Sequence, residues 1–460
     1  MKKAVLTLVF FGVVIPLAWI LFHKYEGSIP EVDISLPSQY LKKSYEMNLN
    51  VKDEGTGLRR VMVSLMQNGN EKVLLDKKYP PSSIFSLYSD NKTIQDSFTI
   101  PVESRKYGMN DGDATIRILV TDYSWHGWNK GNQFYEEHPV IIDTKPPQVK
   151  ILTRQHNISR GGTGLVIYKV EEESIQSGVR VGDNFFPGHA GLYDNQMIWA
   201  AFFALDHTQG PGTRIFVEAK DPAGNITKRG FHHYIKDKNF RTDVLNISDR
   251  FLERKMPDID LGVKEDDFAA TDKPLLKKFL YINKTLRKEN VDKVLSVPAD
   301  TKADLMWEGR FGRLAGAANR ARYADRRIYK YKGKEIDKAT HLGIDLASTA
   351  NAPVGAANHG RVILAEDIGI FGNTVIIDHG FGLASLYSHL SQVSVDTGDE
   401  LRKGDIIGQT GLTGLAGGDH LHLSIIVHNV FVNPVEWWDA SWIKNNITSK
   451  IEGVRDQIKQ

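Results

Sequence analysis

One segment of the sequence, from His341 to His422, limits most strongly what this chain can fold into. It contains short apolar runs separated by glycines, which is typical of antiparallel β structure. Near its end, His420-Leu421-His422 opens an apolar run that ends at Val427. Residues two apart on a strand point to the same side, so both imidazoles are predicted to face one pocket, with Leu421 turned into the core.

At the start of this segment, His341 and Asp345 lie on either side of Gly343. In a fully extended strand the two outer Cα atoms would be about 13 Å apart, at ~3.3 Å per residue. A bend at Gly343 is predicted to bring both side chains to one metal, and the glycine would leave space for the ion. Two imidazoles and a carboxylate are three ligands, and three protein ligands plus a water are typical of a catalytic zinc.

Further motifs accompany these residues in a fixed order. They are Gly372-Asn373-x-Val375, Asp378-His379-Gly380, Tyr387-x-His389-Leu390-Ser391, Lys403-Gly404-Asp405, Gly411-x-Thr413-Gly414 and Val432-Asn433-Pro434. With the histidine motifs, they make residues 307–439 resemble the lysostaphin-type zinc metallopeptidases, which cut the peptide cross-links of peptidoglycan. The resemblance implies one Zn²⁺ per chain, bound by His341, Asp345 and His422.

The same resemblance implies that His389 and His420 are the catalytic pair. Zinc lowers the pKa of a bound water to about 7, and a neutral histidine can take the proton of that water. A histidine that carries a proton can stabilise the oxyanion, and the sequence leaves open which of the two does which. In one place the chain departs from the family, because Tyr323-Ala324 replaces a common Phe-Gly and leaves the local turn open.

The N-terminus predicts where in the cell the protein is located. Lys2 and Lys3 precede Ala4–Phe22, a run of 19 uncharged residues that is about long enough to span a bilayer. We expect an uncleaved, single-pass anchor in the inner (cytoplasmic) membrane, with the rest of the chain extracytoplasmic or periplasmic. The alternative is a cleaved signal peptide, although the run ends without a cleavage site of the A-x-A type.

Composition excludes several classes of function. The net charge of +2 gives no strong field for nucleic acid, so no nucleic-acid partner is expected. The chain has no cysteine, which rules out disulfides, thiol catalysis and a lipid anchor on cysteine. A length of 460 residues suggests roughly three domains, and the anchor is assigned to residues 1–29.

The region between the anchor and the histidine motifs is predicted to be β-rich. Alternating apolar runs bounded by turn residues predict a β-sandwich module at 30–145 and a second at 146–240. Asp122 and Asp221 each end a strand and precede a turn with glycine and asparagine, so the second module reads as a copy of the first. Both resemble bacterial immunoglobulin-like modules, whose role as spacers or as binding or gating modules stays open.

Residues 241–305 are predicted to form a short helical connector, in which Asp272 caps a helix and Pro274 lies in its first turn. A metallopeptidase domain at 306–440 and a short helix or frayed tail at 441–460 follow. The fold class is therefore mainly β and multidomain. We also hypothesise that the connector or the earlier modules cover the zinc cleft until a regulatory protein partner moves them.

The predicted function is that of a membrane-anchored zinc metalloendopeptidase, a hydrolase that remodels the cell wall at peptidoglycan stem peptides. The alternatives are a non-hydrolytic wall-binding protein or activator of other hydrolases, and a zinc peptidase that acts on proteins. Other polar and aromatic residues are assigned to turns, surfaces or packing. They are His232, His233, His359, Asn373, His379, Thr410, Thr413, His428, Trp437 and Trp438.

Overall fold

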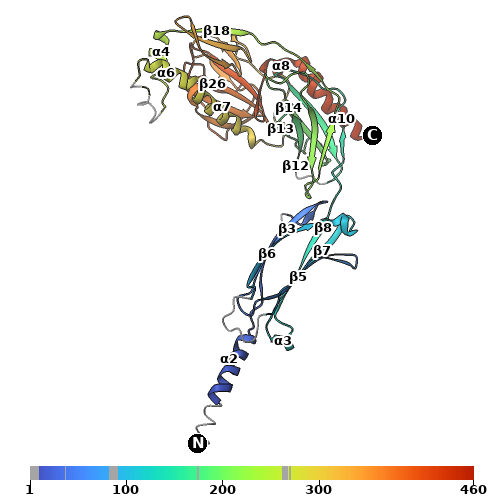
Figure 1. Ribbon diagram of the computed structural model, residues 1–460. Coiled ribbons are helices and arrows are strands. Elements are labelled where there is room, and N and C mark those ends of the chain that lie inside the picture. Colours follow the sequence, from blue (N-terminus) through green and yellow to red (C-terminus); the bar gives the residue numbers. More distant parts are fainter. Residues whose placement is uncertain are drawn as a thin grey trace. The chain divides into compact units, whose positions relative to one another are not determined.

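The structure is a computed structural model, and it describes residues 10–36, 38–81, 92–172, 176–261, 268 and 271–459. Contacts divide the chain into two compact units, residues 1–146 with 220–225 and residues 147–219 with 226–460. Each unit is built mainly of β-strands (Figure 1), so the predicted mainly β class is confirmed. The domain boundaries predicted from the sequence are finer than this division and stay predictions.

The first unit contains two β-sheets that share one core. One sheet has the order β1 (Glu31–Ser35), β3 (Tyr45–Lys52) and β6 (Gln95–Val102). The other has the order β2 (Tyr40–Leu41), β8 (Gln133–Ile142), β7 (Gly112–Asp122), β4 (Leu58–Gln67) and β5 (Asn70–Lys78). Along β3 buried and exposed residues alternate, as expected of a strand with one face on a core. The short turns η2 (Ser104–Tyr107) and α3 (His126–Asn129) lie between strands.

The predicted membrane anchor, Ala4–Phe22, falls partly outside the described residues. Its described part forms the π-helical turn η1 (Phe10–Val14) and the α-helix α2 (Ile15–Lys24). Within the described ranges, no helix is both long enough and apolar enough to cross a bilayer. The structure therefore gives no support to the predicted transmembrane helix.

The second unit begins with three small sheets. Their orders are β14 (Ile198–Ala204), β11 (Thr163–Val170), β9 (Val149–Ile151); β13 (Asn184–Pro187), β12 (Gln176–Val181), β15 (Ile215–Lys220), β16 (Ile226–Gly230); and the parallel pair β10 (Asn157–Ser159), β17 (Tyr234–Lys236). One hydrophobic cluster continues from these sheets into the C-terminal β domain. Phe202 and Trp437, for example, pack with ring centroids 6.0 Å apart. This second β region thus shares its core with the domain that carries the histidine motifs.

The predicted helical connector begins with a strand. β18 (Thr242–Ile247) pairs in parallel with β20 (Arg326–Tyr331), whose other neighbour is β21 (Lys334–Thr340). The helical elements that follow are α4 (Asp249–Lys255), α6 (Pro274–Tyr281), the π-helical turn η4 (Ile282–Leu286), α7 (Arg287–Ser296) and η5 (Val297–Ala299). The predicted cap at Asp272 is wrong, because Lys273 is the N-cap of α6 and no side chain caps that end.

The C-terminal domain is organised around one antiparallel sheet. Its order is β19 (Ala318–Ala321), β22 (Ile344–Ala347), β30 (Leu421–Val427), β26 (Leu383–Leu390), β25 (Asn373–Asp378), β24 (Gly360–Asp367) and β28 (Glu400–Leu401), with β31 (Val430–Val432) paired to β30. A small sheet of β23 (Pro353–Gly355), β29 (Ile406–Gln409) and β27 (Gln392–Val393) and the turn η6 (Gly369–Phe371) complete it. Every residue of β26 and β30 is buried, so both faces of the central strands are covered.

The C-terminal tail is an ordered part of the second unit. It forms α8 (Pro434–Trp438), α9 (Ala440–Ile443), the π-helical turn η7 (Lys444–Thr448) and α10 (Ser449–Lys459) (Figure 1). The Tyr193 hydroxyl donates to the Ile451 carbonyl at 3.0 Å, and Lys450 Nζ donates to the Leu165 carbonyl at 3.0 Å. These contacts pack α10 against the first sheets of this unit.

Candidate metal centre

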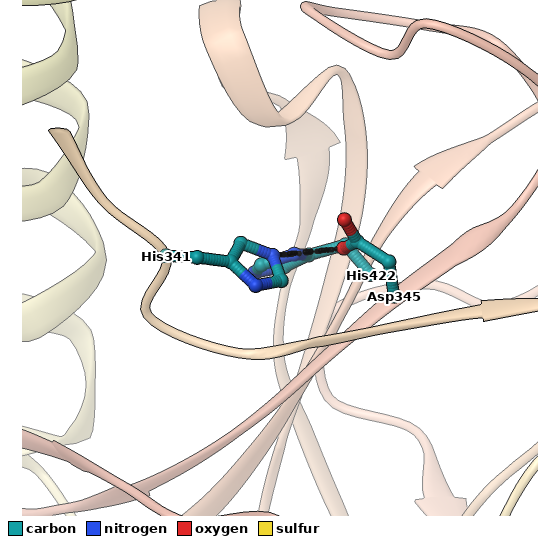
Figure 2. A group of neighbouring side chains, drawn as sticks. All are labelled: His341, Asp345 and His422. Carbon is teal, nitrogen blue, oxygen red and sulfur yellow. Dashed lines mark hydrogen bonds and ion pairs between the residues drawn. The ribbon is translucent and has the colours of Figure 1, made fainter. Parts of the chain in front are cut away.

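Two of the predicted ligands lie directly opposite each other on neighbouring strands. Asp345 on β22 pairs with His422 on β30 in the antiparallel register, and His341 lies just before β22. The distances His341 Nε2–Asp345 Oδ1, His341 Nε2–His422 Nδ1 and His422 Nδ1–Asp345 Oδ1 are each 2.9 Å. Figure 2 shows the three side chains converging on one point. The structure therefore brings together the three residues that the sequence singled out.

Gly343 makes this convergence possible, but in a different way from the predicted one. A Cβ at this position would lie 2.5 Å from Ser424 Oγ and 2.6 Å from His422 Nε2. The missing side chain thus makes room for the ring of His422 and for Ser424, and not directly for an ion. His341 lies outside the strand, so the chain bends between residues 341 and 345 as predicted.

Each ligand is held from behind by an outer hydrogen bond. His341 Nδ1 lies 3.0 Å from the Arg322 carbonyl, and His422 Nε2 lies 3.1 Å from Ser424 Oγ. Arg327 Nη2 donates to Asp345 Oδ2 at 2.9 Å, which leaves Oδ1 for the centre. Outer partners of this kind fix the tautomer and orientation of metal ligands. The sequence left the turn at Tyr323-Ala324 open. In the structure Ala324 has a φ of 61°, and its backbone N–H donates a hydrogen bond to the His341 carbonyl at 2.7 Å.

The three inward atoms fit a dication better than they fit each other. Two imidazole nitrogens and one carboxylate oxygen are mutually 2.9 Å apart, and protons on two nitrogens cannot satisfy all three contacts. Neighbouring ligands of a tetrahedral zinc, with bonds of about 2.0–2.2 Å, lie roughly 3.3 Å apart, so a small expansion would admit the ion. The donor set is also the mixed N and O set that zinc accepts.

His389 reaches the same place from the end of β26. The pairing of β25 with β26 is irregular between Asn373 and Val375, which marks a bulge at Ser388 and His389 of β26, opposite Thr374. His389 itself has a φ of 64°, a left-handed conformation that is uncommon for residues other than glycine. Bulges often redirect a side chain beside an active site. The His389 Nδ1 lies 2.9 Å from the Thr413 carbonyl, which leaves Nε2 as the ring nitrogen available to a ligand.

His420 completes the group from the residue before β30. Its N–H donates to the Gly411 carbonyl at 3.2 Å, and its Nδ1 lies 2.7 Å from the Gly418 carbonyl. Its Nε2 lies 3.5 Å from Asp345 Oδ1, and its ring centroid lies 4.8 Å from that of His389. His420 and His422 therefore face one pocket as predicted, and Leu421 between them is buried.

The electrostatics of these groups reflect one buried carboxylate among several imidazoles. Burial alone favours a neutral Asp345, but the charge of His341 and hydrogen bonds from His341, His420 and His422 hold its pKa well below the usual range. Burial lowers the pKa of His422 to about 4. Burial, with the charges of His420 and His422, also holds the pKa of His389 well below its usual range. Burial opposes a charge on His420, but its hydrogen bond and charge interaction with Asp345 raise its pKa.

The five residues line a cavity of about 300 Å³. The connector supplies one wall of it through β18, α4 and α6, for example with Leu245, Phe251 and Phe279. At the end of α4 the buried Lys255 donates through Nζ to the Leu412 carbonyl at 2.6 Å, so the connector also holds the glycine-rich loop 411–418. That the connector gates the cleft stays a hypothesis, but the connector does form part of the cavity wall.

The residues that the sequence set aside lie apart from the ligands. His379 and His428 follow directly after β25 and β30, and both are buried, so of the predicted surface or turn positions they occupy the turn. Trp437 is fully buried and packs on Phe311 with centroids 5.2 Å apart, which confirms a packing role. Thr413 Oγ1 donates to the Leu390 carbonyl at 2.9 Å, a turn contact rather than a free polar group.

Sequence reasoning missed several residues that line the cavity or position its side chains and that lie outside the motifs. Arg327 donates to Asp345, and no spacing in the sequence indicates this contact. Arg287 and Asn283 come from the connector, where no spacing rule pointed to them. A further group of convergent carboxylates, Glu26, Asp53 and Asp122, occurs in the first unit but contains no imidazole.

Comparisons with known proteins concern the C-terminal part of the chain. The profile of Peptidase family M23 matches residues 339–434. The DD-carboxypeptidase/endopeptidase Mpg of Neisseria meningitidis serogroup B is 40% identical over 95 residues, which are 21% of this chain and 22% of that protein. The peptidoglycan DD-endopeptidase ShyA of Vibrio cholerae is 36% identical over 98 residues, which are 21% of this chain and 23% of that protein.

Another relative, whose name does not describe a peptidase, matches a segment of similar length. Stage II sporulation protein Q of Bacillus subtilis is 36% identical over 116 residues, which are 24% of this chain and 41% of that protein. The solved catalytic domain of lysostaphin from Staphylococcus simulans is 25% identical with a TM-score of 0.25, and the match covers 28% of this chain and 98% of that domain. The chain thus spans between about a fifth and two fifths of the length of these curated relatives. The predicted resemblance is confirmed for the C-terminal region, and the immunoglobulin-like character of the N-terminal part is not confirmed.

Proposed function

We propose that this chain, whose residues 339–434 form a lysostaphin-type domain of peptidase family M23, is a zinc-dependent endopeptidase that cuts peptide cross-links of peptidoglycan. The observation that carries the proposal is a complete set of groups in one cavity. His341, Asp345 and His422 converge within hydrogen-bond distance, and His389 and His420 line the same space. Relatives named as peptidoglycan endopeptidases support the choice of substrate.

The residues of the chain divide the chemistry as follows. When bound, zinc supplies Lewis-acid activation of the attacking water and of the scissile carbonyl. His341, Asp345 and His422 would hold the ion. His389 and His420 each have Nδ1 beside a backbone carbonyl. This leaves Nε2 of His389 for the substrate, whereas Nε2 of His420 lies 3.5 Å from Asp345 Oδ1. One of these rings accepts the proton of the attacking water, and the other donates to the developing oxyanion.

Digestion of purified sacculi tests this proposal most directly. The full chain loaded with zinc should release soluble fragments, and a chelator should abolish the release. Mass spectrometry of the products should show new termini in the stem peptides and intact glycan strands. Release of fragments that a chelator does not affect, or cleavage of glycan only, would contradict the proposal.

A second candidate is a non-hydrolytic binder of the wall or an activator of other hydrolases. Its specific support is the relative named as a sporulation protein, because that name describes no hydrolase. Sacculi separate the two functions. A binder would sediment with sacculi equally well with and without chelator and would release no fragments.

Location outside the cytoplasm is a further part of the proposal, because the substrate lies there. Fractionation of cells that express the full chain tests it. The protein should be found in the membrane or periplasmic fraction. Recovery of all protein in the cytoplasmic fraction would contradict both the location and access to the substrate.

A further inference from the structure

Among the described residues that line the cavity at the metal centre, two carry a guanidinium group and one carries a carboxylate. Arg287 and Arg327 line it together with Asp345, which is a predicted metal ligand. With zinc in place, the charge of Asp345 would be directed to the ion. The cavity would then keep an excess of positive charge beside the reacting amide, which favours an anionic group on whatever binds there.

Arg287 is held in a fixed position by neutral groups. Its Nη2 donates to Asn283 Oδ1 at 2.8 Å, and its Nε lies 3.2 Å from the Asn283 carbonyl. Asn283 is buried and is oriented in turn by Asp337, whose Oδ2 accepts from Asn283 Nδ2 at 2.9 Å. The side-chain amide of Asn283 therefore separates the Arg287 guanidinium from the Asp337 carboxylate.

Among the residues that the structure describes, no carboxylate forms an ion pair with Arg287. The side chain is only partly exposed. A guanidinium has five N–H donors, and Asn283 engages only the Nε and one Nη2 donor of Arg287. Charged groups that leave water are normally paired. The remaining donors of Arg287 are consequently positioned to bind an anion supplied from outside the chain.

A second donor in the same cavity also lacks a partner. Arg327 binds Asp345 through Nη2, but its buried Nε has no hydrogen-bond partner in the described part of the chain. Buried donors of this kind are rare in folded proteins unless a ligand or water satisfies them. Arg287 also follows the π-helical turn η4, a local distortion that is frequent at functional sites.

We propose that Arg287 binds a free carboxylate of the substrate peptide beside the amide to be cut, with Arg327 Nε as a second donor to the same part of the ligand. The proposal rests on the proposed function and narrows its substrate to peptides with an anionic residue at that position. It also makes the connector a specificity element, since η4 and α7 lie outside the matched residues 339–434.

Paired synthetic peptides test the proposal with the full chain loaded with zinc. One pair differs by a side-chain carboxylate against its carboxamide, and the other by a C-terminal carboxylate against its carboxamide. In one pair, kcat/KM should be ~10–100-fold higher for the carboxylate form, as expected of a charge-assisted hydrogen bond. Equal rates for both forms in both pairs would overturn the proposal without any variant.

Arg287→Gln should reduce the preference for the carboxylate form to less than about 3-fold. Arg287→Lys should retain part of the preference. Lys284→Gln is the matched control, because it removes a charge from the exposed side of the same turn and should leave the preference unchanged. An undiminished preference in a folded Arg287→Gln protein would overturn the proposal.

Binding separates this proposal from the proposed function. Calorimetry on the zinc-free chain should show tighter binding of the carboxylate peptide than of its carboxamide, and Arg287→Gln should remove the difference. If the loaded chain cuts no peptide but this binding difference is present, the proposed function fails and the role of Arg287 stands. If cleavage occurs without a binding or rate difference, the role of Arg287 fails alone.

Discussion

The three predicted metal ligands and the predicted catalytic histidine pair line the same cavity, but the chain positions them by different means. Asp345 and His422 are opposite residues of two paired strands, and each has an outer hydrogen-bond partner. His389 depends on a bulge and a left-handed φ, and His420 depends on loop carbonyls. Both members of the pair thus rely on irregular backbone.

This difference suggests that the predicted ligands on the strands are held rigidly, whereas the histidine pair can adjust its position. Ligands on neighbouring strands keep a fixed separation, because strand pairing sets the distance between opposite residues. A ring at a bulge or in a glycine-rich loop can shift to follow a substrate. Variants of the two groups should therefore fail in different ways, and the following predictions test that difference.

His422→Ala should cause the largest loss. Without Nδ1 of His422 only two protein ligands are left, so metal affinity and turnover should both fall by more than about 10³-fold. Metal content after dialysis and release of peptide fragments measure the two effects. His341→Ala should behave in the same way. Full activity of His422→Ala at stoichiometric enzyme would refute the ligand assignment.

His389→Ala should break turnover while leaving the metal in place. Its Nδ1 is hydrogen-bonded to the Thr413 carbonyl, and its ring lies 5.8 Å from that of His422 between centroids, without a hydrogen bond to it. Zinc content should therefore stay near one per chain. The rate should fall by about 10²–10⁴-fold, the usual contribution of a positioned acid or base. His420→Ala should give the same pattern. Loss of zinc from either variant would show that the two groups are not separable.

The convergence of the predicted ligands could be read from the sequence because regular strands position two of them, Asp345 and His422. The alternation along 420–427 correctly predicted that Leu421 points into the core. The contribution of Gly343 was only half predicted, because the atoms that occupy its space, Ser424 and His422, come from a strand about 80 residues later.

The parts that sequence reasoning could not reach depend on tertiary contacts. No local pattern indicates that β18 pairs with β20, or that Arg287 of the connector faces the cavity. The bulge at His389 likewise appears only when β25 and β26 are paired. Loop and bulge geometry is set by partners distant in sequence, whereas a two-residue period is carried by the strand itself.

Ser424→Ala tests whether the outer contacts of the ligands matter. The Ser424 hydroxyl lies 3.1 Å from His422 Nε2 and donates to the Leu342 carbonyl at 2.9 Å, so it links both ends of the centre. Its removal should weaken zinc binding by about 10–100-fold and leave turnover at saturating zinc nearly unchanged. Competition with a zinc chelator measures the affinity. Unchanged affinity would show that strand pairing alone orients the ligands.

Acid should destabilise the zinc-free protein, and the same experiment compares a ligand with a histidine outside the cavity. Burial lowers the pKa of His422 and of His379 to about 4, against roughly 6.5 in an unfolded chain. Because the fold favours the neutral rings, their contribution is complete above about pH 6.5 and is lost as the pH falls toward 4. Each of the two rings should lower the free energy of unfolding of the protein by about 2 kcal/mol between pH 8 and pH 5.

Denaturant unfolding at the two pH values, with His422→Gln and His379→Gln as matched variants, measures these losses. In the zinc-free protein both variants should reduce the pH dependence to a similar extent. With zinc bound, the ion competes with protons for His422 but leaves His379 unchanged. Zinc should therefore suppress the part of the loss that belongs to His422 only. Equal suppression of both parts would mean that the metal stabilises the whole domain, and that the ligand histidines are not individually coupled to it.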